Sequence, residues 1–194
     1  MQKVQPKYRT QKHIHYYDFE QGSPEWLAGR VDHFTGSNAA KLLTSFGAGR
    51  HAFAKEGSFK GNFYTKRGHL LEIEAIELYE TIKGIEVGKT GFVKNDKYRY
   101  CLYSPDGFLP KKTIEVKCFS KDAHLKTIEY QGLDILAQCH FGQLILEKQS
   151  TDLILYCPHP GIPPEKQLVI ITIKRDKDIQ DNFKQKIGAW NEQN

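Results

Sequence analysis

Residues 132–148, GLDILAQCHFGQLILEK, are apolar around nearly the whole circumference of the helix that their spacing predicts. A helix without a polar side is stable only when other elements bury it on several sides. Strand-like runs precede it at 113–120 and follow it at 151–158 and 166–176, and the amphipathic pattern of 177–190 predicts a closing helix. The chain therefore requires a layered fold in which strands pack against a buried helix.

The first half of the chain predicts three further helices. Ser23 followed by Pro24 is typical of an N-cap with proline in the first turn. A short helix is predicted at 38–43, and the strong helical pattern of 64–84 predicts a long helix that Gly84 ends. These helices all precede the first run of strands.

Residues 44–62 are rich in glycine and serine and predict a loop. The runs at 85–95, 98–109 and 113–120 have the composition of strands, and the turn residues between them predict a meander. The order of elements, with helices first, then strands, a helix, strands and a closing helix, predicts an α/β protein with a mixed sheet and helices on its faces.

The composition restricts the class of protein. With 194 residues the chain is long enough for one domain with a sizeable core, and its formal charge of +5 suits a polyanionic partner. No run approaches about eighteen apolar residues and the start of the chain is polar, so we expect a cytoplasmic protein without a membrane span. The four cysteines form no Cys-x-x-Cys pair, which favours free thiols over a metal cluster.

Two carboxylates and a lysine of the stretch YSPDGFLPKKTIEVK, residues 103–117, are candidates for a functional site. Asp106 lies between proline and glycine, where a turn aspartate is common. Strand alternation places Glu115 and Lys117 on one face of the next strand, with Ile114 and Val116 on the other. Taken singly, these residues fit a turn and an exposed polar face. Taken together, an acid at a bend and an acid and a lysine on the adjacent strand can converge at one point.

Such a cluster has a chemical use. Two carboxylates in close approach repel each other unless a cation lies between them, and Mg²⁺ binds carboxylate and carbonyl oxygens. The carbonyl of Val116 would be a further ligand beside Asp106 and Glu115. Lys117 could hold or deprotonate a metal-bound water, with its pKa lowered by the cation. This combination predicts hydrolysis of a phosphodiester.

A third acid is a candidate for the same site. On the predicted helix at 64–84, Glu72 falls inside the apolar arc, between Tyr79 and Ile76. An acid that faces the core needs a partner. Glu72 is therefore either a third carboxylate of the metal site or a glutamate paired with a neighbouring cation of its own helix.

Three motifs together resemble the PD-(D/E)XK nuclease superfamily and, more narrowly, the lambda exonuclease and YqaJ-like viral recombinase family. They are the G-x-x-x-E of residues 68–72, SPDG at 104–107 and EVKC at 115–118. The resemblance implies a restriction-endonuclease-like core and a bound Mg²⁺, with Mn²⁺ as the alternative. It implies that Asp106, Glu115, the Val116 carbonyl and Glu72 hold the metal.

Further segments are similar to the same family. EWLAGRVDHFTGSNAAKLL carries Arg30 and, seven residues later, Ser37, which the resemblance assigns to the DNA end and its 5′-phosphate. AQCHFGQLIL resembles the family's A-Q-V-Q helix, so Gln138 matches the first, catalytic glutamine. His140 stands where the family has its second glutamine and would contact DNA, but it lies about 160° from Gln138 around a helix.

The resemblance extends from Ser23 to the final helix, which implies a single exonuclease domain at 23–194 and an N-terminal extension at 1–22. It implies a phage-type enzyme that digests double-stranded DNA from its ends, 5′ to 3′, and leaves 3′ overhangs for single-strand annealing. It also implies a homotrimer, an annealing protein as partner and the host cytoplasm as location.

Three alternatives stay open at this stage. The first is a restriction-type or repair endonuclease on the same fold. The second is a Cas4-like iron–sulfur nuclease, for which no cysteine cluster is visible. The third is a catalytically silent DNA-binding protein, which the intact set of Glu72, Asp106, Glu115 and Lys117 disfavours.

Overall fold

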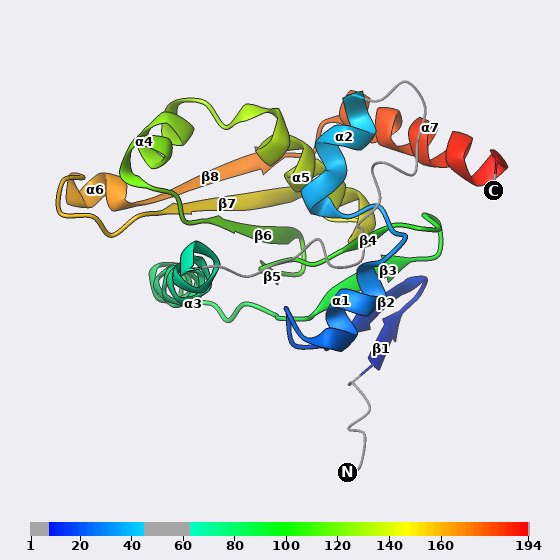
Figure 1. Cartoon of the computed structure of the whole chain (residues 1–194), viewed down its shortest axis with the longest axis horizontal. Helices are drawn as coiled ribbons and strands as arrows, with labels where there is room; N and C mark the ends of the chain where they lie inside the picture. Colours follow the sequence, from blue (N-terminus) through cyan, green and yellow to red (C-terminus); the bar gives the residue numbers. More distant parts are fainter. Residues whose placement is uncertain (1–7, 45–62, 194) are drawn as a thin grey trace, which may run out of the picture.

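The computed structural model describes residues 8–44 and 63–193, which form two four-stranded sheets and the helices around them (Figure 1). The loop predicted at 44–62 lies, except for Thr44, outside the described residues. Within the described ranges, no helix combines the length and apolar composition needed to cross a bilayer.

The first sheet is antiparallel throughout. Its strands follow one another in the order β1 (Tyr8–Gln11), β2 (Ile14–Tyr17), β3 (Phe92–Asn95) and β4 (Leu102–Tyr103). Strands β1 and β2 were not predicted, and they fall within residues 1–22, for which an N-terminal extension was expected. Because β2 pairs with β3 along its whole length, these residues are part of the sheet.

The second sheet is mixed, as predicted. It contains β5 (Gly107–Phe108), β6 (Lys112–Lys117), β7 (Ser150–Tyr156) and β8 (Leu168–Lys174). Strands β6 and β7 are parallel, and the other pairs are antiparallel. The predicted meander is wrong in one respect, because its strands divide between the two sheets after β4. Pro105 stands at this break, and a proline has no N–H with which to continue a ladder.

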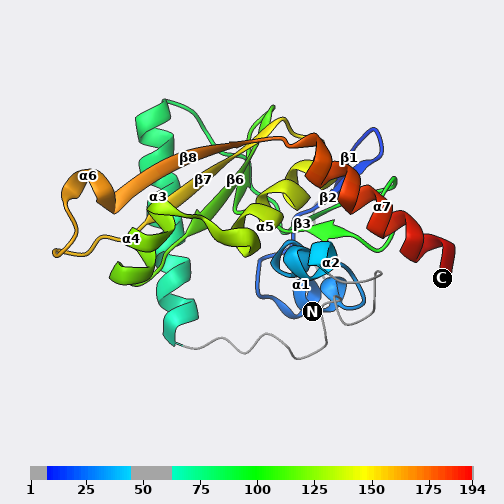
Figure 2. The same ribbon diagram turned by 90° about the horizontal axis from the view of Figure 1, so that it is seen from above.

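Helices cover both faces of the second sheet. On one face lies α3 (Phe63–Lys83), which runs across the strands in Figure 2. Its buried side chains Ala75, Ile76 and Tyr79 share a cluster with Ile114, Val116, Ile154 and Tyr156 of β6 and β7. On the other face lie α4 (Lys121–Glu129), which the sequence analysis did not predict, and α5 (Gly132–Ile145) (Figure 1).

Helix α5 lies between the two sheets. Its Cys139 packs with residues of β7, whereas Phe141 and Leu144 belong to the core shared by the first sheet and α7 (Lys177–Gln193). The predicted burial of this helix is confirmed from Ala137 onward. Its first turn differs, since Leu133 is 49% exposed.

The remaining elements are short. They are α1 (Pro24–Arg30), the 3₁₀ helix η1 (Gly36–Asn38), α2 (Ala39–Thr44) and α6 (Pro164–Gln167). The predicted start of α1 is confirmed, because the Ser23 hydroxyl accepts a hydrogen bond from the Trp26 N–H at 3.2 Å and Pro24 occupies the first turn. The predicted end of α3 is also confirmed, since Gly84 has a positive φ of 63°, which glycine adopts without strain.

Candidate active site

A pocket of about 210 Å³ opens where α1, α3, α5 and β6 approach one another. Nearly all the predicted site residues line it: Arg30, Ser37, Glu72, Asp106, Glu115, Val116, Lys117 and Gln138. Gln21, Trp26, Gly36 and Ser104 complete the lining, and the sequence analysis had assigned no site role to them. Residues more than 100 positions apart in the chain thus meet in one cavity.

Asp106 is held at the start of β5 by the backbone of β6. Its Oδ2 accepts a hydrogen bond from the Val116 N–H at 2.7 Å. The preceding turn is fixed by Gln21, whose side-chain amide donates to the Pro105 carbonyl at 3.1 Å. Among the described residues Oδ1 has no hydrogen-bond partner, so one oxygen of this carboxylate is free to bind a ligand.

Glu115 lies at the centre of the site and is only 1% exposed. Its Oε1 accepts hydrogen bonds from the Lys117 ammonium at 2.7 Å and from the Gln138 side-chain amide. The Lys117 ammonium also donates to Gln138 Oε1 at 3.0 Å. The predicted alternation is confirmed, since Glu115 and Lys117 face α5 whereas Ile114 and Val116 pack on the α3 side.

Tyr103 supports the other oxygen of this carboxylate. Its hydroxyl donates to Glu115 Oε2 at 2.5 Å, and its ring is fully buried. The ring fits between two glycines: a Cβ at Gly36 would lie 2.7 Å from a ring carbon, and one at Gly142 would lie 2.5 Å away. Sequence reasoning missed Tyr103, although it directly precedes SPDG, because no local spacing relates it to Gly36 or Gly142.

The carboxylates of Glu72, Asp106 and Glu115 repel one another. Burial, followed by the neighbouring carboxylates of Glu115 and Glu72, raises the pKa of Asp106 well above its ordinary value. Burial also raises the pKa of Glu72, and the Glu115 carboxylate raises it further. Among the side chains that the structure describes, no cation forms a salt bridge with Glu72, although His69 of the same helix acts electrostatically to lower its pKa.

Lys117 differs from the expectation in one respect. Burial alone would lower its pKa, but the Glu115 and Asp106 carboxylates outweigh burial and raise it. In the chain without a cation, Lys117 is therefore held as an ammonium and acts as a hydrogen-bond donor. The predicted lowering of this pKa depended on a nearby metal.

The donor set fits a hard divalent cation. Carboxylate and carbonyl oxygens are the ligands that Mg²⁺ and Mn²⁺ prefer, and a cation would relieve the repulsion that raises the pKa values of Asp106 and Glu72. In the described part of the chain, no three His, Cys, Asp or Glu side chains are already arranged around a metal position. The carboxylates are instead held by the hydrogen bonds described above. All four cysteines are free thiols, as expected.

Arg30 forms one wall of the pocket. Its guanidinium lies 4.1 Å from the centre of the Trp26 ring and donates to the Ser104 and Ser37 hydroxyls at 3.1 and 3.3 Å. Burial lowers the pKa of Arg30 to about 10, which leaves it charged at neutral pH. A fixed guanidinium beside an exposed serine is a suitable binding site for a phosphate.

The structure does not bring His140 into this pocket. Its imidazole is buried on another side of α5, where Nδ1 lies 3.2 Å from Gln143 Oε1, and its carbonyl accepts from the Gln180 amide at 2.8 Å. Gln138 faces Glu115 instead. The angle of about 160° between the two positions on a helix accounts for this separation.

The mixed sheet, with Asp106 before β5 and Glu115 and Lys117 on β6, has the fold class of PD-(D/E)XK nucleases. The sequence matches the YqaJ-like viral recombinase domain over residues 25–147. The chain therefore belongs to the YqaJ-like viral recombinase family. A search of curated protein sequences found no match.

Several solved structures share the fold. An alkaline exonuclease, LHK-Exo, from Laribacter hongkongensis superposes with a TM-score of 0.74 at 23% identity, over 88% of this chain and 92% of that one. LHK-Exo in complex with dAMP superposes with the same TM-score at 21% identity and the same coverage. A phage-related exonuclease from Haemophilus somnus 129PT has a TM-score of 0.57 at 18% identity, over 84% of this chain and 93% of that one.

Proposed function

We propose that this protein is a divalent-metal-dependent deoxyribonuclease that digests linear double-stranded DNA from its ends. The observation that carries the proposal is the meeting of Glu72, Asp106, Glu115, Lys117 and Gln138 in one pocket. Family membership and the fold shared with an alkaline exonuclease and a phage-related exonuclease support the reaction class. The structure solved with dAMP supports a nucleotide-sized ligand for this fold.

The metal would be held by Asp106, Glu115, the Val116 carbonyl and Glu72. When bound, Mg²⁺ or Mn²⁺ supplies Lewis-acid activation of the phosphate and of water. The Lys117 ammonium orients the attacking water or a phosphate oxygen by donating a hydrogen bond. Gln138 fixes the relative positions of the Lys117 and Glu115 side chains, because its N–H donates to the carboxylate while its carbonyl accepts from the ammonium.

Arg30 and Ser37 are proposed to bind the 5′-phosphate of a DNA end. The guanidinium is already fixed by Ser104 and by the Trp26 ring, so little side-chain freedom is lost on binding. A terminal phosphate bound at this wall would determine which phosphodiester bond lies next to the carboxylates of Asp106 and Glu115. Digestion would then proceed 5′ to 3′ and leave 3′ overhangs for single-strand annealing.

The decisive assay compares linear and circular duplexes, with and without 5′-phosphates, in Mg²⁺, Mn²⁺ or EDTA. We expect digestion of the phosphorylated linear duplex only when a metal is present, with label released early from the 5′ end. Asp106→Asn and Lys117→Ala should lower turnover by about 10²-fold or more without loss of helical content. Lys126→Ala, which removes an exposed lysine of α4, should leave turnover unchanged.

Each contrary result identifies an alternative. Cutting of closed circles would indicate a restriction-type or repair endonuclease. DNA binding without metal-dependent cleavage would indicate a silent DNA-binding protein. Normal digestion by Asp106→Asn or Lys117→Ala would remove the proposed site from the reaction.

The assembly of the enzyme is a separate part of the proposal. The family resemblance supports a homotrimer around the duplex, an annealing protein as partner and a location in the host cytoplasm. Light scattering should then give three times the 22.3 kDa of the chain. A monomeric mass in the presence of DNA ends would contradict the trimer but leave the chemistry of the pocket intact.

A further inference from the structure

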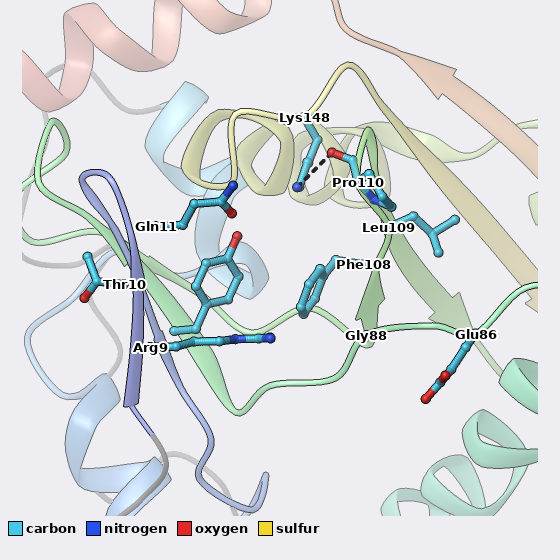
Figure 3. Close-up of a pocket in the computed structure, with 10 residues that line it drawn as sticks. Arg9, Thr10, Gln11, Glu86, Gly88, Phe108, Leu109, Pro110 and Lys148 are labelled. Atoms are coloured by element: carbon cyan, nitrogen blue, oxygen red, sulfur yellow. Dashed lines mark hydrogen bonds between the residues drawn. The ribbon is translucent and has the colours of Figure 1, made fainter.

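A second pocket, of about 450 Å³, lies on another part of the molecule, between the β1–β2 hairpin and the turn from β5 to β6. Arg9, Tyr16, Phe108 and Lys148 supply its aromatic and cationic lining. Figure 3 shows the side chains of Arg9 and Lys148 reaching toward Phe108, Arg9 from β1 and Lys148 from the segment that follows α5. The function proposed above does not use these residues.

The aromatic part of this pocket is a tilted pair of rings. The centres of the Tyr16 and Phe108 rings are 5.4 Å apart, with 40° between their planes. The Arg9 guanidinium lies 4.8 Å from the centre of the Tyr16 ring and 5.2 Å from that of Phe108. Its plane and the adjacent Phe108 ring together form a surface on which a flat ligand can stack.

The charge of the pocket is not balanced. In the described part of the chain, no carboxylate forms a salt bridge with Arg9 or Lys148. Glu86 also contributes to the lining, but its side chain is exposed and forms no salt bridge with either cation. The Lys148 ammonium lies 6.0 Å from the Phe108 ring centre and donates to the Pro110 carbonyl at 3.1 Å, which leaves it further hydrogen atoms to donate.

The position of the pocket favours one chemical class. Phe108 follows Asp106 of the candidate active site by two residues, so the same short stretch of chain contributes to the lining of both pockets. A flat base and a phosphate match the stacking surface and the ammonium. An acidic peptide would supply the negative charge but would have no reason to be delivered beside Asp106.

We propose that this second pocket binds one nucleotide, either free or as a unit of single-stranded DNA. Its base stacks against Phe108 and the Arg9 guanidinium, and its phosphate binds the Lys148 ammonium. This inference rests on the proposed function, because digestion of DNA by the nuclease would produce the nucleotide that the pocket binds. Binding itself requires no metal and no cleavage.

The test is carried out in EDTA, so that no DNA is cut. A short oligothymidylate containing 5-iododeoxyuridine is irradiated with the full chain, and the crosslinked residue is identified by mass spectrometry. We expect a crosslink at Phe108 or Tyr16. Fluorescence anisotropy then measures the affinity of the oligothymidylate, and competition with dTMP distinguishes a site for the free nucleotide from a site for a strand.

Variants of the two cations give the quantitative arm. Arg9→Gln and Lys148→Gln should each weaken binding by about tenfold, and Lys148→Gln should lower the salt dependence by about 0.7 in log–log slope. Lys12→Gln removes a charge from the same hairpin outside the pocket and should change the affinity less than about twofold.

The outcomes separate this inference from the nuclease proposal. Crosslinking at Phe108 in a protein that digests no DNA would overturn the nuclease and keep the nucleotide pocket. Crosslinks confined to the candidate active site, or equal affinity in all variants, would overturn the pocket. The pocket would also be overturned if an acidic peptide displaced the oligothymidylate whereas dTMP and unlabelled single-stranded DNA did not.

Discussion

Replacement of Tyr103 by phenylalanine tests the support of the central carboxylate. The change keeps the buried ring between Gly36 and Gly142 and removes only the hydroxyl that donates to Glu115 Oε2. Hydrogen bonds to charged groups contribute about 1.5–3 kcal/mol, and loss of the donor leaves a carboxylate oxygen buried without its partner. We therefore expect the free energy of unfolding to fall by about 1.5–3 kcal/mol.

The measurement is urea unfolding, in which the midpoint should fall while the slope m is unchanged. For a chain of this length the melting temperature should fall by about 3–12 °C. In a Glu115→Gln background the same substitution should cost only about 0.5–1.5 kcal/mol, since the acceptor is then neutral. Tyr130→Phe is the matched control, because Tyr130 is 69% exposed and its hydroxyl can be solvated.

Activity gives a second readout of the same change. If the proposed nuclease is correct, Tyr103→Phe should lower kcat by about 10- to 100-fold with little change in KM, since it disturbs a carboxylate that would hold the metal. Equal losses of stability in the wild-type and Glu115→Gln backgrounds would refute the reasoning. They would show that the hydroxyl does not act through Glu115.

Three further predictions follow from contacts elsewhere in the structure. Gly36→Ala would place a Cβ 2.7 Å from the Tyr103 ring, so nuclease activity should fall sharply, and wild-type activity would show that the close fit does not matter. Asp152 is buried, which would raise its pKa, but hydrogen bonds from Thr172 and Lys112 outweigh burial and lower it. Its stabilising effect should be present above the unfolded pKa of about 3.9 and be lost as the pH falls through the lower folded value, and in Asp152→Asn the urea midpoint should lose this acid dependence. Mg²⁺ at about 100 times its dissociation constant should stabilise the wild type by about 2.7 kcal/mol and Asp106→Asn by much less, as thermal unfolding with and without EDTA will show.

Local signals predicted much of what the structure contains. Ser23 and Gly84 marked helix ends because capping depends on neighbouring residues. The alternation of Glu115 and Lys117 followed from the geometry of a single strand. These features need no knowledge of the rest of the chain.

The features that were missed depend on distant contacts. Strand β2 pairs with β3, more than 70 residues later, and β1 pairs with β2, so a reading of the local sequence did not reveal these strands. The support of Glu115 by Tyr103 requires two glycines from separate segments to meet around one ring. For His140, alignment with a motif suggested a contact with DNA, whereas helix geometry already placed it about 160° from Gln138, and the structure has its imidazole buried beside Gln143.

Helix α5 touches both sheets and also carries the amide that joins Glu115 to Lys117. A small shift of one sheet relative to the other would therefore displace the Gln138 amide from Glu115 and Lys117 before any strand unfolds. The geometry of the candidate active site thus depends on intact packing around α5. A fall in turnover upon gentle warming would thus be a more sensitive gauge of internal fit than circular dichroism.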